Sequence, residues 1–152
     1  MRHFKIKNIF SYVVVAALVA ALSISCKSNE EPKDNTHSNH PSSGTYTGTV
    51  GSSSSTGTVT ITGGACNIRG TAFDNSGNQQ LNYDITITKW YNEAGYSESI
   101  VSVGGEATPR GEATVAAPTG YTSFSVNYNG NTIRVGFQVA GTWYSTSDMT
   151  RQ

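Results

Sequence analysis

The sequence predicts an all-β domain from Gly44 to Gln152: a small antiparallel β-barrel (OB-like or up-and-down) or a β-sandwich of about eight strands. After position 43, Leu and Lys occur once each, and no apolar residues recur at helical spacing. Thr, Val, Ile and Tyr dominate instead, which suits the half-buried surface of a strand. In several runs apolar and polar residues alternate, as is typical of an antiparallel sheet with one face on a core.

The individual strands follow from this alternation and from the turn residues between the runs. Alternation is clearest over 81–88 and 133–139, and Asn129-Gly130 is a strong hairpin signal between two alternating runs. Gly-rich and Asn-rich turns separate the remaining runs. We expect strands near 44–50, 57–62, 65–73, 80–91, 96–103, 112–116, 121–129, 131–140 and 142–146.

Two tryptophans, Trp90 and Trp143, are candidate aromatic contacts for a ligand or a partner. Strict alternation places Trp90 on the polar face of its strand, opposite Tyr83 and Ile85. The alternative is that Trp90 covers the end of a barrel.

Residues 1–25 are predicted to be a signal peptide. Basic residues near the start precede an apolar run of ten residues, Val13 to Leu22, which is too short to span a bilayer. The run ends in Leu22-Ser23-Ile24-Ser25-Cys26, which resembles the lipobox of bacterial lipoproteins, although Ser23 replaces the usual Leu. The resemblance implies cleavage before Cys26 and lipidation of its thiol. The alternative is an ordinary signal peptide with a cysteine at its end by chance.

Residues 26–43 are expected to form a lipidated cysteine followed by a flexible polar tether, because nothing here can bury an apolar face. Lys27 followed by Glu30 and Glu31 resembles the export signal of surface lipoproteins in some Gram-negative bacteria. This resemblance implies an outer-membrane lipoprotein, attached to the membrane through its lipid and exposed on the cell surface. The alternative location is the periplasmic face of the same membrane.

The domain offers little catalytic chemistry. All three histidines precede position 44 and only Cys66 follows it, so Ser-His-Asp, Cys-His and zinc sites are not expected there. We predict no catalytic residue, metal or cofactor, although the carboxylates leave glycosidase-like chemistry open in principle. Cys66 shares the parity of Ile68 and is expected to be buried, a reactive thiol being the alternative. Ten basic residues balance ten acidic ones, which argues against nucleic-acid binding.

A candidate contact loop contains Glu106, Thr108, Pro109 and Arg110. Pro109 favours an extended backbone at Thr108, and extended loops are what protease clefts bind. In size, lipobox, tether and β composition the chain resembles the potempins, small surface lipoproteins. This resemblance of layout implies inhibition of a secreted peptidase and assigns no role to any residue. The alternatives are a glycan-binding or small-ligand-binding lipoprotein, and a structural accessory of an outer-membrane complex.

Overall fold

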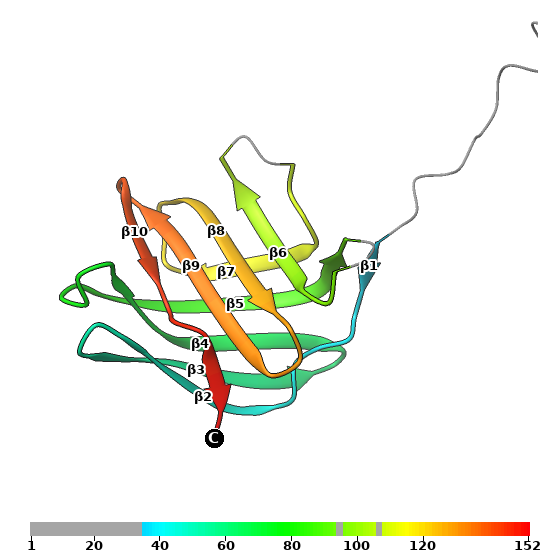
Figure 1. The fold of residues 1–152 in the computed structure, drawn as a ribbon. Helices are drawn as coiled ribbons and strands as arrows, with labels where there is room; N and C mark the ends of the chain where they lie inside the picture. The colour runs from blue at the N-terminus through cyan, green and yellow to red at the C-terminus, as the bar shows by residue number, and fades with distance from the viewer. Residues whose placement is uncertain (1–34, 94–95, 106–107) are drawn as a thin grey trace, which may run out of the picture. The chain divides into compact units, whose positions relative to one another are not determined.

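The computed structural model describes residues 35–93, 96–105 and 108–152, and within them the chain is all-β, as predicted. Eleven strands form one antiparallel sheet that curls into a partly closed ring (Figure 1). Within the described ranges, no helix has the length and apolar character needed to cross a membrane. The strands are β1 (Thr36–His37), β2 (Gly44–Val50), β3 (Ser53–Thr62), β4 (Ala65–Asp74), β5 (Gln80–Asn92), β6 (Ser99–Gly104), β7 (Glu112–Ala117), β8 (Tyr121–Tyr128), β9 (Thr132–Val139), β10 (Thr142–Ser145) and β11 (Met149–Arg151).

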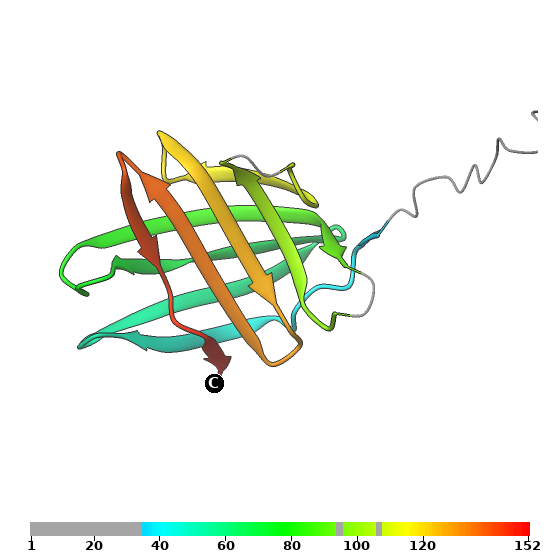
Figure 2. The same cartoon turned by 45° about the horizontal axis from the view of Figure 1, so that its top comes forward.

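The ring runs from β2 through β3, β4 and β5 to β6, β8 and β9. β5 pairs with β6 only at Tyr91 and Asn92, and β7 occupies the rest of this edge of β5 from Asp84 to Lys89. β6, β8 and β9 therefore diverge from β5 and cross over the strands β3 and β4 (Figure 2). This crossing leaves the outer face of β8 and β9 as a separate surface.

The last predicted strand, 142–146, corresponds to β10, and a further strand that was not predicted, β11, follows it; the two close the ring. β10 joins β9 to β4, and β11 joins β9 to β2. Between them Thr146 is buried, and its hydroxyl accepts a hydrogen bond from the backbone N–H of Val135 at 2.9 Å. A side chain here satisfies a donor that a regular ladder would pair with a carbonyl, and so the strand is interrupted.

The core fills the inside of the ring. The predicted alternation is confirmed: Tyr83, Ile85 and Ile87 are buried on β5, as are their counterparts on β9. Each such side chain contributes about 1.5–3 kcal/mol of transfer free energy. The main buried cluster consists of Tyr46, Val59, Cys66, Ile68, Ala72, Tyr83, Ile85, Ile87, Trp90, Val101, Phe124, Val126, Ile133, Val135, Phe137 and Met149.

The prediction that Trp90 lies on the polar face is wrong, because Trp90 is fully buried. The pairing of β5 with β7 shifts register between Ile87 and Lys89, so Thr88 and Lys89 are both exposed in succession. A bulge of this kind inserts one residue and inverts the alternation beyond it. Trp90 therefore faces the core, where its ring lies 5.5 Å from that of Tyr128.

The folded unit begins at Asn35, before the expected boundary at Gly44. Residues 35–42, which we call the N-terminal strap, lie against the domain through β1, which pairs with Trp90 and Tyr91 of β5. Pro41 is fully buried. This part of the expected tether is thus ordered, because polar groups of the domain bind it. Cys26, Lys27, Glu30 and Glu31 lie outside the described residues.

Candidate functional site on the outer face of strands β8 and β9

The turn between β8 and β9 is the predicted Asn129-Gly130 hairpin. Gly130 has a φ of +91°, which favours glycine. The side-chain oxygen of Asn129 accepts hydrogen bonds from the backbone N–H of Asn131 at 3.3 Å and of Thr132 at 3.0 Å, and from the Thr132 hydroxyl at 2.8 Å. The turn is therefore held by its own side chains, and it fixes the register of the strands on either side.

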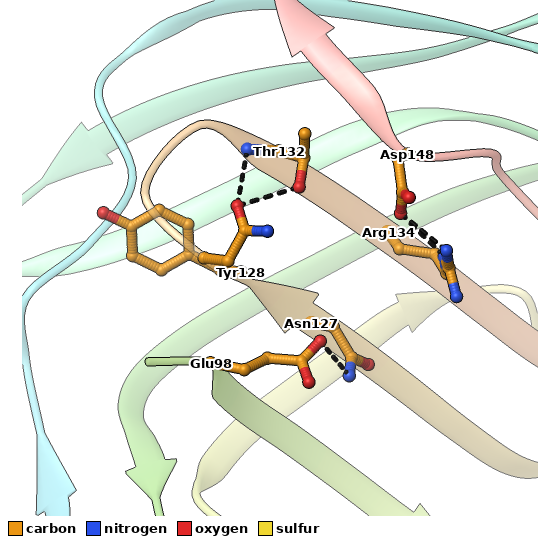
Figure 3. A pocket seen from close by; sticks show the side chains of 7 residues that line it. Glu98, Asn127, Tyr128, Thr132, Arg134 and Asp148 are labelled. Atoms are coloured by element: carbon orange, nitrogen blue, oxygen red, sulfur yellow. Dashed lines mark hydrogen bonds and ion pairs between the residues drawn. The ribbon is translucent and has the colours of Figure 1, made fainter. Parts of the chain in front are cut away.

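That register places Asn127 of β8 directly opposite Arg134 of β9, both on the outer face. Asp148, which precedes β11, reaches the same place because β11 closes the ring alongside β9. These three residues line one part of a small cavity of about 130 Å³ that we call the polar pocket (Figure 3). The polar pocket is lined by Glu98, Asn127, Tyr128, Asn129, Thr132, Arg134 and Asp148.

Each charged side chain of the polar pocket is oriented by a neighbour. Nε and Nη2 of Arg134 both lie 2.8 Å from Oδ1 of Asp148, and Oε1 of Glu98 accepts a hydrogen bond from Asn127 at 2.8 Å (Figure 3). Among the described residues, the second oxygen of each carboxylate has no protein partner. The pocket thus offers free acceptors, together with guanidinium and amide donors, held in defined positions.

Trp143 lies on the same outer face. It pairs with Gln138, and its indole covers Gly136: a Cβ at Gly136 would come 2.6 Å from Cζ2 of Trp143. Only a glycine leaves room for the ring to lie against the strand. The side chain remains 38% exposed. We call this exposed indole the Trp143 platform.

The Trp143 platform and the polar pocket are adjacent. Gly136 beneath the indole and Arg134 in the pocket are alternate residues of β9 and share one face, about 7 Å apart along the strand. Gln138 borders the platform, and its side-chain oxygen accepts hydrogen bonds from Thr122 at 3.2 Å and Ser123 at 3.4 Å. An exposed aromatic ring therefore stands beside oriented polar groups.

The candidate contact loop is only partly exposed to solvent. Thr108 and Pro109 are exposed, and Glu106 lies outside the described residues. Arg110, however, is bound back to the domain: its backbone pairs with Ser102, its guanidinium lies 5.3 Å from the centre of the Tyr91 ring, and Nη1 lies 3.9 Å from Glu93. The Arg110 side chain, which was expected to project from the loop, therefore already contacts Tyr91 and Glu93.

Two histidines of the strap, His37 and His40, form hydrogen bonds with the domain. Neither contact is predicted from the sequence, because the domain is expected to start at Gly44. Nδ1 of His37 accepts the backbone N–H of Asn39 at 3.2 Å, so the neutral ring carries its proton on Nε2, 3.2 Å from the hydroxyl of Ser99. Ser99 then accepts this bond rather than donating to the imidazole. A nucleophile and its general base require the opposite arrangement.

Cys66 is fully buried, and burial raises the pKa of its thiol to about 12. Such a thiol is not a nucleophile near neutral pH. Within the ranges that the structure describes, His, Cys, Asp and Glu form no group of three or more that could hold a metal ion.

A second polar surface, on β3 and β4, is lined by Thr58, Thr60, Thr62, Asn67 and Arg69. Asn67 and Arg69 are both bound to Asp84, at 2.7 and 2.8 Å, and none of the described residues that line this groove is aromatic. It therefore offers less to a ligand than the face of β8 and β9.

The fold and this face define an all-β protein, a partly ringed antiparallel sheet that carries a polar pocket and an exposed indole on its outer face. No protein-family model, no curated protein and no solved structure matches the chain.

Proposed function

We propose that the protein is a lipid-anchored, non-catalytic binding module whose β domain binds glycans through the Trp143 platform and the polar pocket. The observation that carries this proposal is the indole of Trp143 lying over Gly136 beside the Arg134–Asp148 pair. A sugar ring has an apolar C–H face and a rim of hydroxyls. The indole fits the first, and the carboxylates, amides and guanidinium of the pocket fit the second.

The charge of the polar pocket favours neutral or amino-bearing sugars. Its two carboxylates, Glu98 and Asp148, outnumber its one cation, Arg134, which already pairs with Asp148. An acidic sugar would place a third negative charge among exposed carboxylates, which is unfavourable at low salt. We therefore expect neutral oligosaccharides to bind and uronic-acid or sulfated chains to bind weakly.

Tryptophan fluorescence of the purified domain tests the proposal. Trp90 is buried, so a change in emission on adding a neutral oligosaccharide of hexoses would report on Trp143. In calorimetric titration, which does not depend on the removed indole, Trp143→Ala should show no binding. Ile61→Ala is the matched control, because Ile61 is 39% exposed but lies on β3. If no neutral oligosaccharide binds at millimolar concentration, or if the two variants bind alike, the proposal fails.

The anchor is the second part of the proposal. Lipidation of Cys26 would attach the domain to the outer membrane, and Lys27, Glu30 and Glu31 would direct it to the cell surface. Two or more acyl chains suffice for stable anchoring. Cys26→Ser should move the protein from the membrane fraction to the soluble fraction. Protease treatment of intact cells should degrade the wild-type domain, and protection from it would place the domain on the periplasmic face.

Peptidase inhibition is the second candidate function. It is supported by the exposed Thr108 and Pro109, which lead into the backbone pair of Arg110 with Ser102, because a loop held to its scaffold loses less entropy on binding. Titration against secreted serine and metallo-peptidases tests it. Stoichiometric inhibition that survives Trp143→Ala but not Pro109→Gly would favour inhibition over glycan binding.

A further inference from the structure

Another groove, distinct from the one on β3 and β4, adjoins the polar pocket across the β8–β9 turn. It has a volume of about 430 Å³, and Tyr128 and Asn129 line both cavities. Its other wall comes from the N-terminal strap, through His37 and Asn39, and from the chain around Asn92 and Ser97. We call it the strap groove.

The strap that builds this wall is held by specific bonds. The backbone N–H of Asn92 donates to the carbonyl of Asn35 at 2.9 Å, and His37 bonds Ser99. His40 accepts a hydrogen bond from the buried Trp90 at 3.0 Å through Nδ1, and its Nε2 donates to the carbonyl of Gly64 at 3.0 Å. Without residues 35–42 the groove would lose the part of its wall that His37 and Asn39 form.

The strap groove, like the polar pocket, is lined by hydrogen-bonding side chains. Its lining is amides, hydroxyls and an imidazole around the Tyr128 side chain. Asn39 and Ser97 are exposed, and Asn39 bonds His37 through its backbone N–H, so the carboxamide adds both a donor and an acceptor to the groove.

The combined surface is longer than one sugar ring. From Gly136, beneath the Trp143 indole, to Thr132 at the turn is about 13 Å along β9, and the strap groove continues beyond the turn. A chain with repeated hydroxyl groups fits both this length and the hydrogen-bonding side chains along it.

We infer that the Trp143 platform, the polar pocket and the strap groove form one extended site for a neutral oligosaccharide chain, with Asn39 as a specificity-determining contact at its far end. This inference rests on the proposed glycan-binding function. A short sugar would occupy the platform and the pocket, and only a longer chain would reach the strap.

Affinities for a length series of one neutral oligosaccharide, from one unit to six, test this inference in the full mature chain. Wild-type affinity should rise with length until the strap groove is filled. Asn39→Ala should lower the affinity for the longer members by about three- to tenfold, the value of one or two hydrogen bonds, and leave that for the shortest binding member unchanged. Asn75→Ala is the matched control, because Asn75 is an exposed asparagine in a different turn, between β4 and β5.

The outcomes distinguish a failure of the extended site from a failure of the proposed glycan-binding function. Equal affinities of Asn39→Ala and wild type at every length, with binding still lost in Trp143→Ala, overturn the extended site and leave glycan binding intact. An equal loss at every length also overturns it, because Asn39 would then contact the first units. No glycan binding by the wild type overturns both. If Asn39→Ala unfolds at a lower urea concentration than wild type, Ser97→Ala, in the same wall of the groove, replaces it: a loss of affinity confined to the longer members supports the extended site, and no loss overturns it.

Discussion

The indole N–H of Trp90 donates a hydrogen bond of 3.0 Å to Nδ1 of His40, fifty residues earlier in the chain. Because an indole can only donate and the carbonyl of Gly64 can only accept, His40 is neutral with its proton on Nε2. Trp90 also packs against Tyr128, which lines both cavities of the proposed site. One buried side chain thus joins the strap to the site.

Removing either partner of this bond should destabilise the domain. His40→Ala leaves the buried indole N–H without an acceptor, so we expect the free energy of unfolding to fall by about 1–3 kcal/mol. Trp90→Phe removes the donor and some packing. Urea unfolding of the two single variants and of the double variant gives the coupling. His40→Ala should cost clearly less in the Trp90→Phe background, and additive losses would contradict the bond.

The strap should contribute to stability although it lies outside the predicted domain. A chain that starts at Asn35 keeps the buried Pro41, the β1 pairing and the bonds of both histidines. Its urea midpoint should equal that of the longer mature chain. A chain that starts at Gly44 should lose about 2–4 kcal/mol, from exposed apolar surface and unpaired buried groups. Equal midpoints for the two truncations would show that the strap only rests on the barrel.

The fold could be predicted from local patterns because the alternation and the Asn129-Gly130 turn act over a few residues. The position of Trp90 could not, since the bulge at Thr88 depends on pairing with β7, which lies more than twenty residues further along the chain. The strap could not be predicted for a similar reason: its composition is that of a solvated tether, and only long-range contacts, such as the bond from Trp90 to His40 and the pairing of β1 with β5, set it apart.

The polar pocket illustrates the same limit. Outward alternation on the two strands could have singled out Asn127 and Arg134, but their direct pairing depends on the hairpin register. Asp148 joins them only because β11 closes the ring, and Glu98 directly precedes β6, outside the strand in which it was expected. By contrast, the placement of Trp143 depends on local features: it lies on the short strand β10, and its ring covers Gly136 of the neighbouring strand β9.

Gly136→Ala should impair glycan binding while leaving the fold intact. The new Cβ would come 2.6 Å from the Trp143 ring, so the indole must move away from the strand. Because the ring is exposed, the cost in stability should be under about 1 kcal/mol, whereas emission and affinity should both change. Gly70→Ala provides the contrast: its Cβ would overlap the backbone carbonyl of Thr56, which cannot move freely, and overpacking of this kind costs about 1–3 kcal/mol. Unchanged affinity in Gly136→Ala would remove the platform from the proposed site.

Stability should decline at acid pH in part through Asp74, the last residue of β4, whose carboxylate holds the turn that leads to β5. The backbone N–H of Gln79 and the hydroxyl of Ser76, with the N–H of Asn78, donate to its carboxylate and lower its pKa below the usual value. A carboxyl group with a lowered folded-state pKa contributes stability above its unfolded pKa of about 3.9 and loses it as the pH falls through the lower folded value. Asp74→Asn should therefore be less stable than wild type at neutral pH, and the difference should shrink below about pH 4. Urea midpoints of both proteins across this range measure it, and Asp148→Asn, in the Arg134 ion pair, serves as the exposed-carboxylate control. A difference between wild type and Asp74→Asn that stays constant with pH would mean that the turn is held by its backbone bonds and not by the ionised carboxylate.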